Sequence, residues 1–341
     1  MCKRILASQT NTEEGVPFYK IGTIGNTPDA YISKELFDDY KAKYNYPHQG
    51  EVMITCAGTV GKCVIYDGKD AYYQDSNIVW IDNPSQHITN EFLYHLLGKV
   101  DWRKLNSTTI IRIYNDDLRN LKLNYPQIEE QQKISRLLSL LDERIATQNK
   151  VIEDLKKLKC AIAERLFKVT SGEVMTLSQV CNIQKGKQVN GDSLSETGTY
   201  YVMNGGTEPS GYYERYNAPA NTISISEGGN SCGYVQYNRD AFWSGGHCYT
   251  LTDIQPNACN LYLYHYLKSK ESAIMKLRIG TGLPNIQKKD LEMFAVLLPP
   301  VATQIRISAF LTAIERKTTN EEILLNHFRE EKQYLLRQMF I

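Results

Sequence analysis

Two ten-residue stretches, YPQIEEQQKI at residues 125–134 and LPPVATQIRI at residues 298–307, decide the fold of this chain. They lie 173 residues apart and share the spacing Pro-x4-Gln-x2-Ile, and the alignment around them continues without a gap for about sixty residues. Solenoid repeats are much shorter, roughly 20–50 residues, and stack several deep. The chain is therefore written as two large copies of one unit, and we expect an internal pseudo-twofold axis.

A heptad pattern follows each of the two prolines. Apolar residues recur alternately four and three positions apart, which is the spacing of a coiled-coil seam. The seam positions are Ile134, Leu138, Leu141, Ile145, Ile152 and Leu155 in the first copy, and Ile307, Leu311, Ile314, Leu325, Phe328 and Leu335 in the second. Polar interruptions fall in register, Gln148 with Glu321 and Lys159 with Lys332.

The uninterrupted length of this pattern predicts a helix over residues 127–168, roughly 60 Å long at 1.5 Å per residue. One interpretation is that each long helix packs on its own domain. The uninterrupted length favours the other interpretation, that the two helices pair with each other. Because the second globular domain lies between them in the sequence, an antiparallel pair restores a twofold axis and would place one globular domain near each end of a rod.

The remaining sequence forms two tyrosine-rich globular parts. Residues 1–125 and 169–299 each hold 11 of the 23 tyrosines. β-Branched and aromatic runs bounded by Gly, Asn and Asp predict strands, and short amphipathic helices are expected after them. The predicted strands are Glu51–Thr55, Gly61–Tyr66, Asn77–Ile81, Thr222–Ser226, Gly233–Tyr237 and His247–Thr252, and the predicted helices are Glu91–Gly98 and Leu261–Lys270.

The fold class that we expect is α+β, with two mixed α/β domains separated by two long helices. The expected boundaries are 1–125 for the first domain, 126–168 for the first long helix, 169–299 for the second domain and 300–341 for the second long helix.

Composition indicates an ordinary globular protein, with 42% hydrophobic and 23% charged residues and a formal net charge of +1. Residues 1–125 carry 14 basic and 15 acidic residues, and residues 169–299 carry 10 and 11. Any DNA contact must therefore come from local clusters of cations. No apolar run is long enough to span a bilayer, and the N-terminus does not resemble a signal peptide. The eight dispersed cysteines form neither CxxC pairs nor zinc-site spacings, which favours a reducing cytoplasm and predicts no metal site.

Two segments come close to known catalytic motifs but lack features that those motifs require. Residues 56–63, CAGTVGKC, lack the first glycine and the final hydroxyl of a phosphate-binding loop, so a glycine turn between strands is the better account. Asp29, Asp39 and Lys41 resemble the acidic core of a metal-dependent nuclease. That chemistry requires the second acid and the lysine on one strand, whereas the surrounding sequence is typical of a charged helix or loop.

Two equivalent polar loops are the remaining candidates for function. Residues 107–113, STTIIRI, align with residues 280–286, GTGLPNI, which places Arg112 where the second copy has Asn285. Arginine suits guanine and asparagine suits adenine, so this exchange predicts a change in the base that is recognised. Neighbouring cations are candidate phosphate contacts, although an ordinary variable surface loop is an equal alternative for any one of them. They are Lys62, Arg103, Lys104, Lys185, Lys187, Lys276, Arg278 and Lys288.

A Pro-x4-Gln-x2-Ile sequence that opens a long helix, found twice and each time after a globular domain, resembles the specificity subunit of type I restriction–modification enzymes. The resemblance covers nearly the whole chain and includes GTGLPNI at residues 280–286. It implies two target-recognition domains on double-stranded DNA with a split site, and helices that act as a spacer and dock two methyltransferase subunits. It also implies that restriction subunits join the complex, that this subunit catalyses nothing and binds no cofactor, and that the methyltransferase uses S-adenosylmethionine.

The first copy departs from the second at its beginning. Residues 198–201, GTYY, align with residues 15–18, GVPF, and the segment MTLSQVCNIQKGK at residues 175–187 has no counterpart. We therefore expect a shortened first domain. Two rival functions stay open: an interaction protein that binds methyltransferase subunits without recognising a DNA sequence, and a nuclease that uses Asp29, Asp39 and Lys41.

Overall fold

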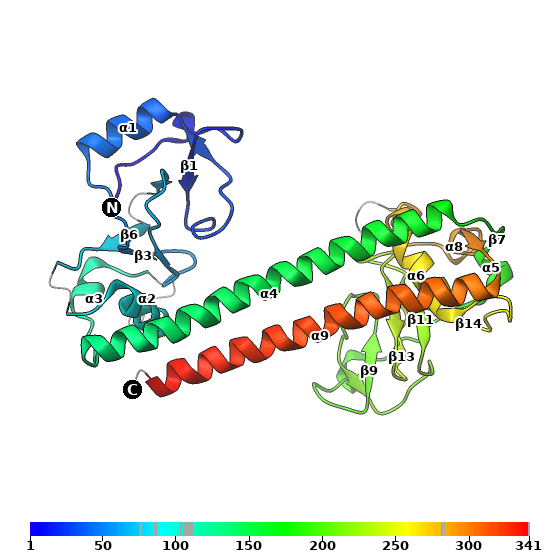
Figure 1. The fold of residues 1–341 in the computed structure, drawn as a ribbon. Helices are drawn as coiled ribbons and strands as arrows, with labels where there is room; N and C mark the ends of the chain where they lie inside the picture. Colours follow the sequence, from blue (N-terminus) through cyan, green and yellow to red (C-terminus); the bar gives the residue numbers. More distant parts are fainter. Residues whose placement is uncertain are drawn as a thin grey trace. The chain divides into compact units, whose positions relative to one another are not determined.

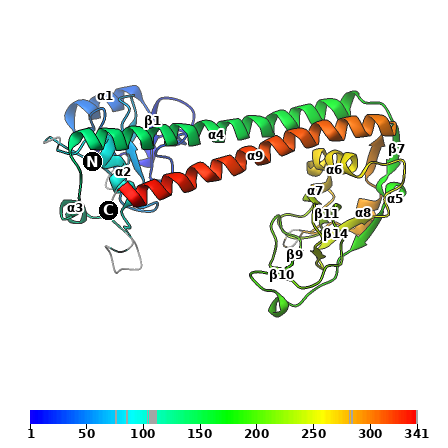
Figure 2. The same ribbon diagram turned by 60° about the horizontal axis from the view of Figure 1, so that its bottom comes forward.

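The structure, a computed structural model, describes residues 1–74, 77–84, 87–102, 104, 112–280, 282 and 284–339. The chain divides into two compact units, one formed by Met1–Gln148 with Leu324–Ile341 and the other by Asn149–Ile323. Figures 1 and 2 show the helices and strands of both units. Two long helices, α4 (Ile128–Val169) and α9 (Val301–Met339), contribute residues to each unit.

The main sheet of the first unit has three antiparallel strands in the order β4-β3-β6, which are Cys63–Ile65, Val52–Thr55 and Ile78–Ile81. Successive side chains of a strand point to opposite faces. On one face of β3, Val52 and Ile54 pack with Leu97 of helix α2 (Asn90–Lys99). On the other face Met53 joins a second core, so β3 is buried on both sides.

The second core of the first unit is built around aromatic rings. It lies between helix α1 (Lys34–Lys43) and a small sheet, β2-β1-β5, whose strands are Tyr31–Ile32, Val16–Tyr19 and Tyr72–Tyr73. Phe37 of α1 meets Tyr46 and Tyr72 edge to face, with ring centroids 5.7 and 6.5 Å apart. Such contacts stabilise a core beyond the area that they bury, because the edge of one ring faces the π-cloud of the other. The short helices η1 (Ala7–Gln9) and α3 (Asn115–Arg119) complete the unit.

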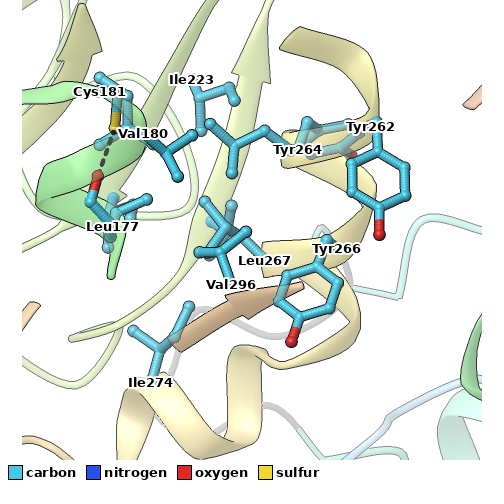
Figure 3. Packing of buried hydrophobic residues seen from close by; sticks show 14 of the residues in the cluster. Leu177, Val180, Cys181, Ile223, Tyr262, Tyr264, Tyr266, Leu267, Ile274 and Val296 are labelled. Atoms are coloured by element: carbon cyan, nitrogen blue, oxygen red, sulfur yellow. Dashed lines mark hydrogen bonds between the residues drawn. The ribbon is translucent and has the colours of Figure 1, made fainter. Parts of the chain in front are cut away.

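The main sheet of the second unit repeats this arrangement with one strand more, in the order β12-β11-β14-β8. Its strands are Val235–Asn238, Thr222–Ser226, Cys248–Thr252 and Asn182–Lys185. Helix α6 (Asn260–Ser269) covers it, and Figure 3 shows Val180, Ile223 and Leu267 in the core that the sheet, α6 and helix α5 (Leu177–Val180) enclose. The additional strand β8 lies within residues 175–187 of the second copy.

Smaller elements surround this core. The strands β9, β10 and β13 (Tyr200–Met203, Tyr212–Tyr213 and Trp243–Ser244) form one small sheet, and β7 pairs with β15 (Glu173–Thr176 and Ala295–Leu298). The helices η2, α7 and α8 are Gly191–Ser193, Glu271–Met275 and Lys288–Glu292. All six strands and both short helices predicted from the sequence are confirmed, with ends that differ by two residues or fewer.

A buried glutamine at the start of each long helix explains the repeated Pro-x4-Gln motif. The Gln131 Nε2 donates to the carbonyls of His87 and Pro126, both at 2.9 Å, and its Oε1 accepts from the Thr89 amide at 2.8 Å. Gln304 makes the same three bonds in the second unit, to Asn257, Pro299 and Cys259 at 2.7–2.8 Å. Each glutamine thus ties a helix start to the segment before α2 or α6 and supplies hydrogen-bond partners to backbone groups of that segment.

The antiparallel pairing of α4 and α9 is confirmed within each unit. In the second unit Lys159 Nζ lies 2.9 Å from Glu315 Oε1, and in the first unit Lys332 Nζ lies 2.5 Å from Asp142 Oδ1. Lys159 corresponds to Lys332 and Asp142 to Glu315 in the two copies. Each copy therefore donates a lysine to the carboxylate of the other, the reciprocal pattern of a twofold interface.

The predicted seam positions are all buried or half-buried. In the first unit Ile134 and Leu138 pack against Phe92 of α2 and also against Leu335 of α9. In the second unit Ile307 and Leu311 belong to the core beneath α6. The seam thus contacts the globular domain as well as the other long helix, so the two interpretations of the heptad pattern both apply.

Candidate nucleic-acid interface

The loop that carries Asn285 is held by backbone hydrogen bonds. Asn285 and Ile279 exchange both of their amide-to-carbonyl bonds, at 2.8 and 3.0 Å, and the chain turns between them through Gly280, whose φ is +96°. The Ile286 amide then donates to the carbonyl of Glu227 at 2.8 Å, directly after the central strand β11. The half-buried Asn285 side chain accepts a hydrogen bond from Gln287 at 3.1 Å. Residues 281 and 283 lie outside the described part of the chain.

Arg112 occupies the same place in the first unit. The amide of Ile113 donates to the carbonyl of Cys56 at 2.9 Å, directly after the central strand β3. The Arg112 guanidinium lies 6.0 Å from the centre of the Tyr114 ring. Burial raises the pKa of the Cys56 thiol to about 11, against the opposing effect of the Arg112 charge. Most of the aligned loop, residues 105–111, and the candidate Arg103 lie outside the described residues.

The two candidate base contacts therefore share one framework. Each directly precedes a buried isoleucine whose amide is bonded to the end of the central strand, although the strands differ in sequence. A fixed backbone with an exchanged side chain is what a recognition loop needs, because base edges are distinguished by geometry as well as by hydrogen-bonding groups.

The candidate phosphate contacts differ in how firmly they are held. The exposed side chains of Lys187, Lys276 and Arg278 make no ion pair within the described chain. Weak pairs hold Lys104 to Asp101 at 3.5 Å and Lys288 to Glu292 at 3.6 Å. Two are held more firmly: Lys62 Nζ donates to the carbonyl of Ile24 at 2.5 Å, and Lys185 Nζ lies 2.6 Å from Glu227 Oε1.

The tertiary structure brings Lys185 close to the Asn285 loop, because the Lys185 side chain and the Ile286 amide are both bonded to Glu227. Sequence reasoning did not identify Glu227 or Tyr249, whose hydroxyl lies 3.1 Å from the Glu227 carboxylate. Burial raises the pKa of the Tyr249 phenol, and the Glu227 charge raises it further. One feature of the sequence could have indicated Glu227. It is an acidic residue directly after the predicted strand TISIS, whereas the residue directly after the equivalent strand of the first copy is Cys56.

The alternative sites have other geometries. Residues 56–62 form the turn between β3 and β4, as predicted, and Gly61 takes φ +83° with the Trp102 ring against it. Asp39 and Lys41 lie on helix α1 and not on a strand, and each is paired elsewhere, Asp39 with Lys43 and Lys41 with Asp70. Asp29 pairs with Lys20 at 3.1 Å. The strand geometry that the nuclease mechanism requires is thus missing at these three residues.

The described residues contain no group of three or more His, Cys, Asp or Glu side chains placed to hold a metal ion. Nor do they include a helix with both the length and the apolar character needed to cross a bilayer.

Comparisons with known proteins place the chain in a family. The sequence model of the type I restriction modification DNA specificity domain matches it twice, at residues 1–157 and 171–327. A putative type I restriction enzyme specificity subunit from Haemophilus influenzae is 48% identical over 155 residues, 46% of this chain and 40% of that protein. A putative type I specificity subunit from Mycoplasma pneumoniae is 30% identical over 167 residues, 48% of this chain and 44% of that protein. The matched residues thus span less than half of either relative.

A solved structure shares the fold. The crystal structure of a type I restriction-modification system S subunit from M. genitalium superposes with a TM-score of 0.71 at 19% identity, covering 100% of this chain and 92% of that one. The two matched ranges coincide with the two copies seen in the sequence. Each range includes one of the two equivalent loops, bonded to the end of a central strand. This chain therefore belongs to the type I restriction modification DNA specificity family.

Proposed function

We propose that this chain is the specificity subunit of a type I restriction–modification complex, and that its two copies each recognise one half of a bipartite DNA site. The observation that carries this proposal is the equivalent placement of Arg112 and Asn285 on one backbone framework. Arginine can donate two hydrogen bonds to guanine O6 and N7, and asparagine can pair with adenine N6 and N7. Exposed cations beside the loops would bind phosphates and set the register without contributing sequence information.

Partner docking is supported by apolar side chains that the long helices leave exposed. Three of them recur at equivalent positions of the two copies: Ile128, Leu137 and Val151 (40, 39 and 37% exposed) correspond to Val301, Phe310 and Leu324 (41, 51 and 41% exposed). In each copy the last two of these positions lie two heptads apart and so share one helix face, and exposed apolar side chains on one face are typical of protein-binding surfaces. Their repetition favours two identical partners, which we take to be methyltransferase subunits that use S-adenosylmethionine. Restriction subunits would then join this assembly, which we place in the cytoplasm. The chain itself would position the DNA and catalyse no reaction.

The test is to map methylation across the genome of a methylation-free host that expresses this chain with its methyltransferase partner. We expect a split motif with methyladenine in each half. Replacing Asn285 by alanine should relax one base position in one half, at a cost of about 1–3 kcal/mol in discrimination. Replacing Arg112 by alanine should relax a position in the other half only, so each variant is the control for the other. An unchanged motif in both variants would refute the assignment of these two residues.

One alternative function has an observation in its favour. Among the described residues, the main sheet of the first unit has three strands where that of the second has four, which favours an interaction protein that binds methyltransferase subunits without recognising a DNA sequence. A purified complex with methyltransferase that methylates no defined motif would support this alternative. A motif with two defined halves would exclude it.

A further inference from the structure

Glu227 is a nearly buried carboxylate at the centre of the candidate interface of the second unit. Its side chain is 11% exposed. One oxygen, Oε1, lies 2.6 Å from Lys185 Nζ and 3.1 Å from the Tyr249 hydroxyl. The other oxygen, Oε2, is buried without a hydrogen-bond partner among the described residues, and His247 Nδ1 lies 3.7 Å from it.

The backbone of Glu227 joins the same elements. Its amide donates to the carbonyl of His247 at 2.9 Å, next to β14, and its carbonyl accepts from the Ile286 amide at 2.8 Å. The Tyr249 hydroxyl also lies 3.2 Å from the Ile286 carbonyl. Glu227 therefore connects the end of β8, which carries Lys185, with β14 and with the loop that carries Asn285.

Burial of a carboxylate is costly unless a cation compensates it, so the Lys185 ammonium is drawn to a defined position. An ammonium group has three N–H donors. One donor serves Glu227, while the Lys185 side chain remains 53% exposed, which leaves donors for a DNA phosphate. A lysine held in this way loses less conformational freedom on binding DNA than one on a free side chain, because part of the ordering has already occurred.

We propose that Glu227 is a positioning residue for DNA recognition by the second copy. Its carboxylate fixes Lys185 as a phosphate contact. Through the Tyr249 hydroxyl, which also contacts the Ile286 carbonyl, the same carboxylate holds the Asn285 loop in place, and this inference rests on the proposed function. The first copy has Cys56 at the equivalent place and Val79 where the second has Tyr249. The contact of Glu227 with Lys185 and Tyr249 therefore exists in the second copy alone, and its loss must affect only one half of the DNA site.

The experiment measures binding of the complete complex with methyltransferase to duplexes in which base pairs of either half-site are exchanged. The substitution is Glu227→Gln, which keeps the volume and one accepting oxygen but removes the charge. We expect discrimination at the half-site of the second copy to fall about tenfold, with the other half-site unchanged. Binding to unrelated DNA should stay about equal, because removal of a negative charge near the phosphates offsets the lost ordering of Lys185. Structural damage alone would weaken both kinds of binding.

Glu271→Gln is the matched control, since Glu271 pairs with Lys268 at 2.6 Å in the same unit but lies at the junction of α6 and α7. It should leave both half-sites unchanged. Tyr249→Phe, which removes the hydroxyl without changing charge, should act on the same half-site as Glu227→Gln and covers the case in which that variant folds poorly. Full discrimination in both Glu227→Gln and Tyr249→Phe, or an equal loss at both half-sites, would overturn the inference alone. A wild-type complex without half-site preference would overturn the proposed function and the inference with it.

Discussion

Replacing Gln304 by methionine should strongly destabilise the second unit. The side chain is fully buried, with 0% exposed, and its three hydrogen bonds of 2.7–2.8 Å join the start of α9 to the amide of Cys259 and the carbonyls of Asn257 and Pro299. Methionine has nearly the same length and forms none of these bonds. Each buried backbone group left without a partner costs about 1–3 kcal/mol. The Pro299 carbonyl is buried, whereas the Cys259 amide and the Asn257 carbonyl are part-buried, so loss of all three bonds predicts a loss of about 3 kcal/mol in the free energy of unfolding.

The loss should be visible locally and globally. Hydrogen exchange measured by mass spectrometry should accelerate at the Cys259 amide and the first turn of α6, and the urea midpoint of the second unit should fall. Gln131→Met removes the matching three bonds of the first unit and should produce a similar loss there. Gln333→Met, at an exposed position of α9, is the control and should change stability by no more than about 0.5 kcal/mol. A loss below about 1 kcal/mol for Gln304→Met would refute the reasoning that these glutamines anchor the helices.

Two further predictions concern the junction of α6 with the long helices. Reversing one charge of the Lys159–Glu315 pair, as K159E or E315K, should lower the free energy of unfolding by about 1–2 kcal/mol, which is less than for a fully buried pair because both side chains are partly exposed. In a double-mutant cycle the variant with both charges reversed should recover most of this loss. Strictly additive losses would contradict the pairing. Burial, assisted by the Lys159 charge, lowers the pKa of His265 to about 4, whereas the nearby Glu315 opposes this shift. His265 therefore contributes stability that is fully present above its unfolded pKa of about 6.5 and is lost as the pH falls towards 4, by at most about 1.4 kcal/mol per pH unit. Denaturation of His265→Gln should show a shallower loss over this range, and an unchanged slope would contradict the assignment.

Much of the architecture could be predicted because it is written as local periodicity and repetition. The heptad spacing after Pro126 and Pro299 predicts the long helices, and alternation of β-branched residues predicts the strands, since both patterns depend on neighbours a few positions apart. The antiparallel pairing could be predicted because the second globular domain lies between the two helices in the sequence. The reciprocal pairs Lys159–Glu315 and Lys332–Asp142 show that the two helices then bury equivalent faces.

The candidate site was predicted only in part. Aligning the copies identified Arg112 and Asn285 as exchanged residues in equivalent loops, but it did not indicate what holds those loops. The partners of the repeated glutamines were equally hidden, since Gln131 bonds to His87 and Thr89, 44 and 42 residues away.

By itself, the sequence determined the duplication, the two long helices and the positions of the recognition loops. Only the tertiary structure decided that Lys185, Tyr249 and the Asn285 loop meet at Glu227. The physical reason is that a buried carboxylate must find its cation and its hydrogen-bond donors wherever the folded chain brings them. Lys185 lies 42 residues before Glu227 and Tyr249 lies 22 residues after it. Contacts over such separations depend on the path of the backbone through several strands, which no local pattern of residues encodes.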